Sequence, residues 1–186
     1  MREKMKLYIF RHGQTKANIQ EICQGLSGNL PLNDTGINQA EELGKELAML
    51  KLPVIYASPQ LRAQMTAQAV AKHNHTPIET VYDLHETMFG EGEGMYEADM
   101  LRKYDSVFKS QLNPSAPDFL TAKIPGGESI QDNYDRFERV NEYIKNNCPH
   151  DKAGVATHGT FMAMVFYRLY GVFHEFRNCE YFVIEI

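Results

Sequence analysis

Short apolar runs alternate along this chain with longer stretches in which apolar residues recur every three or four positions. The short runs predict strands, whereas the longer stretches predict helices. Strands that alternate with helices are typical of βαβ units. We therefore predict an α/β protein, a three-layer α/β/α sandwich with a mostly parallel central sheet. The predicted strands are "KLYIF" (6–10), "PVIYA" (53–57), "PIETV" (77–81), "AGVAT" (153–157) and "YFVIEI" (181–186).

Two of the helical stretches each carry one apolar stripe, which we expect to pack on the sheet. The stripe of "GINQAEELGKELAML" consists of Ile37, Ala40, Leu43, Leu47 and Leu50. The stripe of "ESIQDNYDRFERVNEYIKN" consists of Ile130, Tyr134, Phe137, Val140 and Ile144. A third helix is predicted in "ASPQLRAQMTAQAV", with Ser58 as its N-cap and Pro59 as its first residue.

The segment at about 90–127 differs from the rest, because it is rich in Gly, Pro and acidic residues, with one predicted helix over 96–109. Long insertions of this kind usually carry binding specificity, so we expect this segment to select the substrate. At 186 residues the chain is long enough for one sizeable core and short for two. We expect a single domain over residues 1–186.

Composition excludes several classes of protein. A net charge of −5 provides no broad basic face, which argues against nucleic-acid binding. No segment approaches the roughly 20 apolar residues of a membrane helix, and the N-terminus lacks the apolar stretch of a signal peptide. We expect a cytoplasmic protein with no membrane partner, and both a monomer and a homodimer remain open. Cys23, Cys148 and Cys179 show no paired spacing, so we expect free thiols and no metal site.

Two predicted strands end alike. The first runs into Arg11, His12 and Gly13, and the fourth runs into Thr157, His158 and Gly159. In an open α/β sheet, ligands bind outside the carboxyl ends of the strands, so both histidines are expected at one rim. A glycine lets the backbone approach a ligand, and a following helix N-terminus attracts an anion.

Arg62 is expected in the first turn of the helix that follows the second strand. A cation is disfavoured there by roughly 0.3 to 1 kcal/mol, because the helix dipole is positive at that end. An anion bound beside Arg62 would make the cation favourable at this position instead of unfavourable. Each residue alone has an ordinary explanation: a hydrogen-bonded histidine, a solvated Arg62, or an ion pair between Arg11 and the acidic loop. Together, two His-Gly units and two arginines at one rim favour a shared anion site.

These residues resemble a known family. "RHGQTKAN" is similar to the RHG signature of the histidine phosphatase superfamily, the phosphoglycerate mutase-like proteins. The resemblance continues in the family's order through "GNLPLNDTGINQA", "YASPQLRAQMTA", "LHETMFGEGEG", "PGGES" and "ATHGT", so it covers nearly the whole chain. It implies a phosphoglycerate mutase-like fold.

The resemblance also implies roles for individual residues. Arg11, His12, Arg62 and His158 would form a phosphate pocket, with His12 as the nucleophile that takes up the phosphoryl group. Glu86 would protonate the leaving oxygen. The residues expected to bind substrate are Asn18, Gln24, Gly25 and Gly159. Phosphoryl transfer needs fixed cations on the phosphate oxygens, which guanidinium groups supply. A neutral imidazole can attack if one ring nitrogen is held as a donor, for which the Gly13 carbonyl is the candidate acceptor.

The activity that we expect is metal-independent hydrolysis of a small phosphorylated metabolite through a phosphohistidine intermediate, without a cofactor. Inorganic phosphate or sulfate would occupy the same pocket. A mutase is the alternative, with Arg102, Lys103, Lys109 and Lys123 as candidates for a second anion site. A protein that binds phosphorylated ligands without turnover is a further alternative.

One position departs from the family's pattern. Many phosphatases of the family carry Trp in "GxWEG", and Gly92 stands at that place in a chain that has no Trp. Phe89 and Tyr96 are the candidates to fill the space. "GEGEG" does not match a nucleotide-binding glycine pattern, and its glutamates would repel a pyrophosphate.

Overall fold

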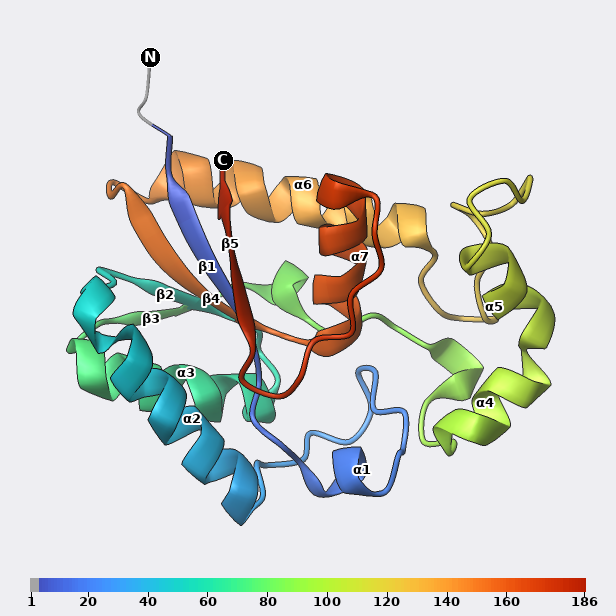
Figure 1. The fold of residues 1–186 in the computed structure, drawn as a ribbon, viewed down its shortest axis with the longest axis horizontal. Coiled ribbons are helices and arrows are strands. Elements are labelled where there is room, and N and C mark those ends of the chain that lie inside the picture. Colours follow the sequence, from blue (N-terminus) through green and yellow to red (C-terminus); the bar gives the residue numbers. More distant parts are fainter. Residues whose placement is uncertain (1–3) are drawn as a thin grey trace.

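The computed structural model describes residues 4–186, which form a central sheet between two layers of helices (Figure 1). The described strands are β1 (Lys6–Arg11), β2 (Ile55–Ala57), β3 (Ile78–Thr80), β4 (Lys152–Thr157) and β5 (Tyr181–Glu185). Their order is β3-β2-β4-β1-β5. All neighbours are parallel except β1 and β5, which are antiparallel. Every predicted strand and the mostly parallel sheet are therefore confirmed.

The helices lie on both faces of this sheet. They are α1 (Lys16–Ile19), α2 (Asp34–Leu47), α3 (Leu61–Asn74), α4 (Glu97–Lys103), α5 (Asp105–Gln111), α6 (Ile130–Asn147) and α7 (Gly159–Tyr170). Helices α2 and α3 cover one face, and α6 and α7 cover the other (Figure 1). Accordingly, Phe10 of β1 packs in one core with α2 and α3, whereas Ile9 packs in a second core with α6 and α7. Side chains of successive strand residues point to opposite faces, so one strand serves both cores.

The two predicted apolar stripes pack as expected, with one exception. All five residues of the α6 stripe are buried. In α2 the residues Ala40, Leu43 and Leu47 are buried, but Ile37 is 47% exposed. Ile37 lies in the first turn of α2, which extends past the end of the sheet (Figure 1). The prediction that Ile37 packs on the sheet was wrong, because the buried face of α2 runs through its neighbour Gly36 and then Ala40 and Leu43.

Helix α3 begins later than predicted. Its N-cap is Gln60 and its first residue is Leu61, so Ser58 and Pro59 lie outside the helix. The Ser58 N–H donates to the carbonyl of Ala156, 3.0 Å away, which continues the hydrogen-bond ladder between β2 and β4. The backbone is still extended at Gln60, so the helix begins at Leu61, two residues after the predicted first residue, Pro59. Arg62 is nevertheless in the first turn, as predicted.

The segment 90–127 forms two short helices instead of one. Helices α4 and α5 are separated at Tyr104, whose backbone leaves the helical region. The Tyr104 ring is buried in a small core with Met100 and Ile124, and its hydroxyl donates to Glu91. The chain therefore turns at the residue whose ring packs in that core.

Two further predictions concern the whole chain. Cys23, Cys148 and Cys179 are free, as expected. Within residues 4–186 no helix combines the length and the apolar character needed to cross a bilayer. The expectation about a signal peptide rests partly on residues 1–3, which lie outside the described residues.

Candidate active site

The register of the sheet brings the two histidines together. Strands β1 and β4 pair in parallel, with their last residues Arg11 and Thr157 opposite each other. The histidine that follows each strand therefore lies at the same level of the sheet. The His12 N–H donates to the Thr157 carbonyl at 3.0 Å. The rings of His12 and His158 lie edge to face with 5.2 Å between their centroids. Both histidines therefore lie at one rim, as the sequence predicts.

His12 is held as a neutral ring. Its Nδ1 is 2.7 Å from the Gly13 carbonyl, which can only accept, so Nδ1 carries the proton and Nε2 has the lone pair. Nε2 in turn accepts from Nε of Arg62 at 3.2 Å. Burial, and then the charges of Arg62 and Arg11, hold the pKa of His12 well below its usual value. At neutral pH this imidazole is available as a nucleophile.

Two arginines flank His12, of which Arg62 is buried and Arg11 is half-buried. Burial lowers the pKa of Arg62 to about 10 and also lowers that of Arg11, but both groups keep their charge at neutral pH. Arg62 donates to the Gly25 carbonyl at 3.0 Å, and Arg11 donates to the Phe176 carbonyl. Arg11 thus contacts backbone here, whereas the ordinary explanation was an ion pair with the acidic loop.

Several buried polar atoms at this place have no partner within the described chain. They are Nε of Arg11, Nη1 of Arg62, Nδ1 of His158 and Oε1 of Gln24. Buried polar groups in folded proteins are almost always hydrogen-bonded. The two guanidinium N–H donors lie on side chains that line one cavity, where the oxygens of an anion would satisfy them.

His158 lies behind His12 and is fully buried. Its Nε2 is 2.8 Å from the Ser58 hydroxyl. Burial, and then the charge of Arg62, keep the pKa of His158 well below its usual value. The sequence left open whether His158 is charged or a neutral donor, and this environment favours the neutral ring.

Glu86 is fixed at the N-terminus of α7. Its carboxylate accepts from the N–H groups of Thr87 at 2.8 Å, Phe161 at 2.9 Å and Thr160 at 3.2 Å. Its own N–H donates to Oε1 of Gln60 at 2.8 Å. A helix N-terminus favours a negative charge, and Glu86 acts electrostatically on both Arg11 and Arg62. Glu86 is therefore at the edge of the same pocket.

One cavity of about 760 Å³ gathers the residues predicted from the sequence. Every one of them except His158 lines it. The Asn18 side-chain oxygen accepts from Thr15 in a capping box, which leaves the amide NH₂ as a donor. Gln24 contributes its unpaired oxygen, so it is suited to a hydroxyl of a substrate rather than to phosphate.

Three glycines permit close approaches at the site. A Cβ on Gly159 would come within 2.9 Å of Nε of Arg11, so this glycine makes room for a guanidinium group. A Cβ on Gly25, which has a φ of +48°, would overlap the Glu93 carboxylate. Gly13 packs on the backbone of Gly36, since a Cβ there would lie 2.4 Å from the Gly36 oxygen. Gly13 is therefore a packing residue, whereas the sequence suggested that it makes room for a ligand.

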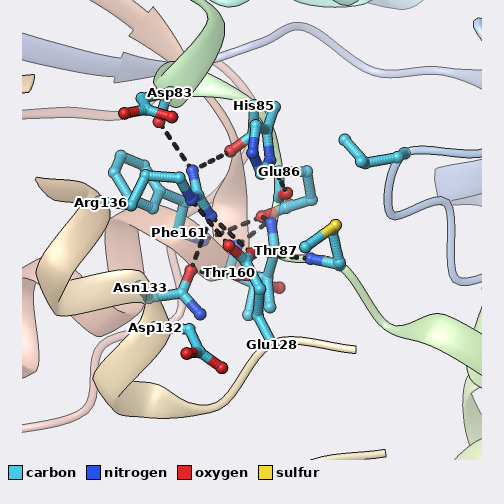
Figure 2. A network of polar contacts seen from close by, with 12 residues as sticks. Asp83, His85, Glu86, Thr87, Glu128, Asp132, Asn133, Arg136, Thr160 and Phe161 are labelled. Atoms are coloured by element: carbon cyan, nitrogen blue, oxygen red, sulfur yellow. Dashed lines mark hydrogen bonds and ion pairs between the residues drawn. The ribbon is translucent and has the colours of Figure 1, made fainter. Parts of the chain in front are cut away.

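The residues that hold Glu86 in place were not predicted from the sequence. Figure 2 shows Arg136 of α6 reaching the backbone of the segment that carries Glu86. Nη1 of Arg136 donates to the carbonyls of Asp83 and His85 at 2.8 and 2.6 Å. The same guanidinium binds both oxygens of Glu128, and Glu128 accepts from the N–H of Met88 at 3.0 Å. Glu128 belongs to "PGGES", so the motif was found but this function was not.

A second missed residue is Glu93, which ties the 24–28 loop to the acidic segment. Its carboxylate accepts from the N–H groups of Leu26, Ser27 and Phe89. Next to it, a Cβ on Gly92 would contact Met100 and Ile124. These two side chains fill the space left by the missing Trp. Of the two candidates, Phe89 packs against the same small core, whereas Tyr96 is 58% exposed.

No metal site emerges among residues 4–186, where no three or more His, Cys, Asp and Glu side chains gather closely enough to hold an ion. His73, one of two histidines at the end of α3, instead pairs with Glu41 at 2.7 Å.

Comparison with known proteins identifies the family. A model of the histidine phosphatase superfamily (branch 1) matches residues 7–185. The chain is 34% identical over 120 residues to the uncharacterized phosphatase PhoE of Bacillus subtilis (strain 168), a match that covers 64% of this chain and 60% of PhoE, less than two thirds of that protein. It is 28% identical over 203 residues to a 2,3-bisphosphoglycerate-dependent phosphoglycerate mutase of Protochlamydia amoebophila (strain UWE25), covering 90% of this chain and 86% of the mutase.

A solved structure shows the same fold. The alpha-ribazole phosphatase from Shigella flexneri superposes with a TM-score of 0.80 at 24% identity, covering 98% of this chain and 91% of the other. The family model spans nearly the whole chain, and the fold agrees with it. This chain therefore belongs to the histidine phosphatase superfamily.

Proposed function

We propose that this protein is a metal-independent phosphomonoesterase that forms a phosphohistidine on His12. The observation that carries the proposal is the neutral His12 ring with its lone pair on Nε2, between two arginines that each have one buried, unpaired N–H donor. Phosphoryl transfer depends mainly on such positioning and on positive charge around the phosphate oxygens. The membership of a family with phosphatase relatives supports the same reaction class.

In the first step Nε2 of His12 forms a bond to phosphorus while the ester bond breaks. Glu86 gives a proton to the departing alcohol oxygen, for which its carboxylate must first take up that proton against the helix N-terminus that favours its negative charge. Arg11 and Arg62 bind the phosphate oxygens, and His158, which is buried outside the cavity, supports the His12 ring through their edge-to-face contact. In the second step Glu86 takes a proton from a water molecule, which attacks phosphorus. The nitrogen–phosphorus bond breaks, phosphate leaves, and His12 and Glu86 return to their starting forms.

The distribution of charge supports hydrolysis over a mutase reaction. A mutase holds a substrate with two anionic ends, which calls for a second set of cations. None of the four cations predicted for this role lines the cavity. Each pairs with a carboxylate instead: Arg102 with Asp99, Lys103 with Glu91, Lys109 with Asp105 and Lys123 with Asp132.

The test is hydrolysis of para-nitrophenyl phosphate in the presence of EDTA. We expect turnover by the wild type, loss of at least about a thousandfold in kcat/KM for His12→Ala, and a phosphorylated His12 detected by mass spectrometry after rapid acid-free quenching. His174→Ala is the matched control, because His174 lines the same cavity but its ring contacts Glu180. It should retain activity.

Two outcomes would redirect the proposal. If a panel of phosphomonoesters gives no release that depends on His12, a binding protein without turnover becomes the better account. If 3-phosphoglycerate is isomerised faster than it is hydrolysed when 2,3-bisphosphoglycerate is present, the protein is a mutase.

A further inference from the structure

The cavity continues well beyond the phosphate pocket, and apolar side chains form much of its wall there. Helices α4 and α5 and the residue that follows them contribute Met100, Leu101, Phe108 and Leu112. Met164 of α7 and Phe173 also line it. Phe173 is held by stacking on Tyr167, with 4.2 Å between ring centroids. A volume of about 760 Å³ is in the range of pockets for whole small molecules, so it provides far more room than a phosphate group needs.

The charges along the same cavity have one sign outside the phosphate pocket. Among the described residues that line it, the only lysine or arginine side chains are Arg11 and Arg62. Glu21, Glu97 and Glu175 line it as well. Burial lowers the pKa of Arg11, and the negative charges of Glu175 and Glu97 oppose that lowering without overcoming it. A second anionic group on a substrate would meet carboxylates and no cation.

We propose that the site selects phosphomonoesters whose alcohol part is bulky, apolar and free of a second anionic group. The inference rests on the proposed function, because it assumes that the phosphoryl group binds between Arg11, His12 and Arg62. An apolar alcohol gains from leaving water for the Met, Leu and Phe walls. A carboxylate or second phosphate on the alcohol would lose its hydration without a partner and would be repelled by Glu97 and Glu175.

The test uses three phosphonates that cannot be hydrolysed: benzylphosphonate, 1-naphthylmethylphosphonate and 4-carboxybenzylphosphonate. Their Kd values are measured by calorimetry on the wild-type protein. We expect the naphthyl compound to bind at least about fivefold more tightly than benzylphosphonate. The carboxylated compound should bind at least about tenfold more weakly. Equal affinities, tightest binding of the carboxylated compound, or no binding of any of the three would overturn the inference.

A pair of variants tests the charge argument. Leu101 lines the cavity and is 42% exposed, so Leu101→Lys adds a cation at the wall without removing a core residue. We expect it to improve the affinity for 4-carboxybenzylphosphonate relative to benzylphosphonate by about threefold. Leu120→Lys is the matched control, because Leu120 is 39% exposed and lies outside this cavity. An unchanged affinity ratio in Leu101→Lys, or the same change in Leu120→Lys, counts against the inference.

These measurements separate the two proposals. Phosphonate binding needs no turnover, so the expected order of affinities together with no His12-dependent hydrolysis would reject the enzyme and keep the ligand class. Hydrolysis that depends on His12, together with equal phosphonate affinities, would keep the enzyme and reject the ligand class.

Discussion

At the scale of single residues, this site depends on two neutral histidines beside two charged arginines. Desolvation costs an imidazolium more than a neutral ring, and the neighbouring guanidinium groups add to that cost. The result is a neutral imidazole at His12 whose Nε2 carries a lone pair, as the proposed nucleophile requires. Burial also lowers the pKa of Arg62, but only to about 10, so Arg62 keeps its charge at neutral pH.

Gly159 is the residue whose replacement should perturb the arginines most directly. In Gly159→Ala the added Cβ would lie 2.9 Å from Nε and 3.0 Å from Cζ of Arg11, so the guanidinium must move. We expect KM for para-nitrophenyl phosphate and Ki for inorganic phosphate to rise by about tenfold, from one weakened charge-assisted hydrogen bond. Thermal unfolding should change little, because alanine is the better helix former.

The phosphate Ki and the Tm of this variant together show whether Gly159 makes room for Arg11 or only stabilises the fold. A variant with an unchanged phosphate Ki would show that Arg11 does not bind phosphate through this guanidinium position. A fall in Tm equal to that of a core variant would instead make Gly159 a structural glycine.

At the scale of elements, a helix far along the chain holds the segment that carries Glu86. Arg136 of α6 joins the carbonyls of Asp83 and His85 to the carboxylate of Glu128 (Figure 2). The side chains of Arg136 and Glu128 are 1% and 7% exposed. The Phe161 ring, in the first turn of α7, covers the guanidinium at 4.3 Å. Segment 83–88, α6 and α7 therefore share one buried ion pair.

Arg136→Lys should break this arrangement, because one ammonium group cannot replace a planar fork that binds a carboxylate and two carbonyls. We expect a loss of about 3 kcal/mol in the free energy of unfolding. We also expect kcat to fall by about tenfold or more with a smaller change in KM, since Glu86 would be misplaced. Urea unfolding and steady-state kinetics measure the two effects.

Arg139→Lys is the matched control on the same helix. Arg139 also contacts the 83–88 segment, through Asp83, but its side chain is 56% exposed. An exposed pair contributes less than about 1 kcal/mol, so this variant should behave like the wild type. If the two variants were equally stable and equally active, Arg136 would have no positioning role.

At the scale of the whole molecule, the buried histidines should make folding depend on pH. The unfolded chain takes up protons on His12, His158 and His85 near pH 6.5, whereas the folded chain resists because all three have lowered pKa values. Stability is therefore complete above pH 7 and is lost as the pH falls below about 6.5. Each fully buried histidine adds up to about 1.4 kcal/mol per pH unit to the slope.

Urea unfolding at pH 7.5, 6.5 and 5.5 measures this slope. The lowered pKa values of exposed carboxyl groups such as Glu41 act only at more acidic pH, outside this window. His12→Gln removes one of the titrating groups and should make the slope smaller. A free energy of unfolding that stays constant from pH 7.5 to 5.5 contradicts the assignment of neutral buried histidines.

The amino-acid sequence alone was sufficient to locate the strands, the main helices and the residues at the rim of the sheet. Periodicity is a property of neighbouring residues, so "LYIF" before His12 and "AGVA" before His158 indicate buried strands without any tertiary information. Because the carboxyl ends of parallel strands share one edge, two histidines far apart in the chain were expected to meet there. The position of Arg62 at the same rim was expected for the same reason, because its helix follows the second parallel strand.

Only the tertiary structure decided what supports and surrounds those residues. Ser58 pairs with His158 across 100 positions, Arg136 pairs with the 83–88 segment, and Met100 fills the space beside Gly92. The break between α4 and α5 at Tyr104 and the apolar wall of the cavity were also decided by the tertiary structure. Local preferences fix the backbone of each element, but a side chain's partner depends on which distant surface packs against it. That choice is made by close packing and by the need to pair buried polar groups.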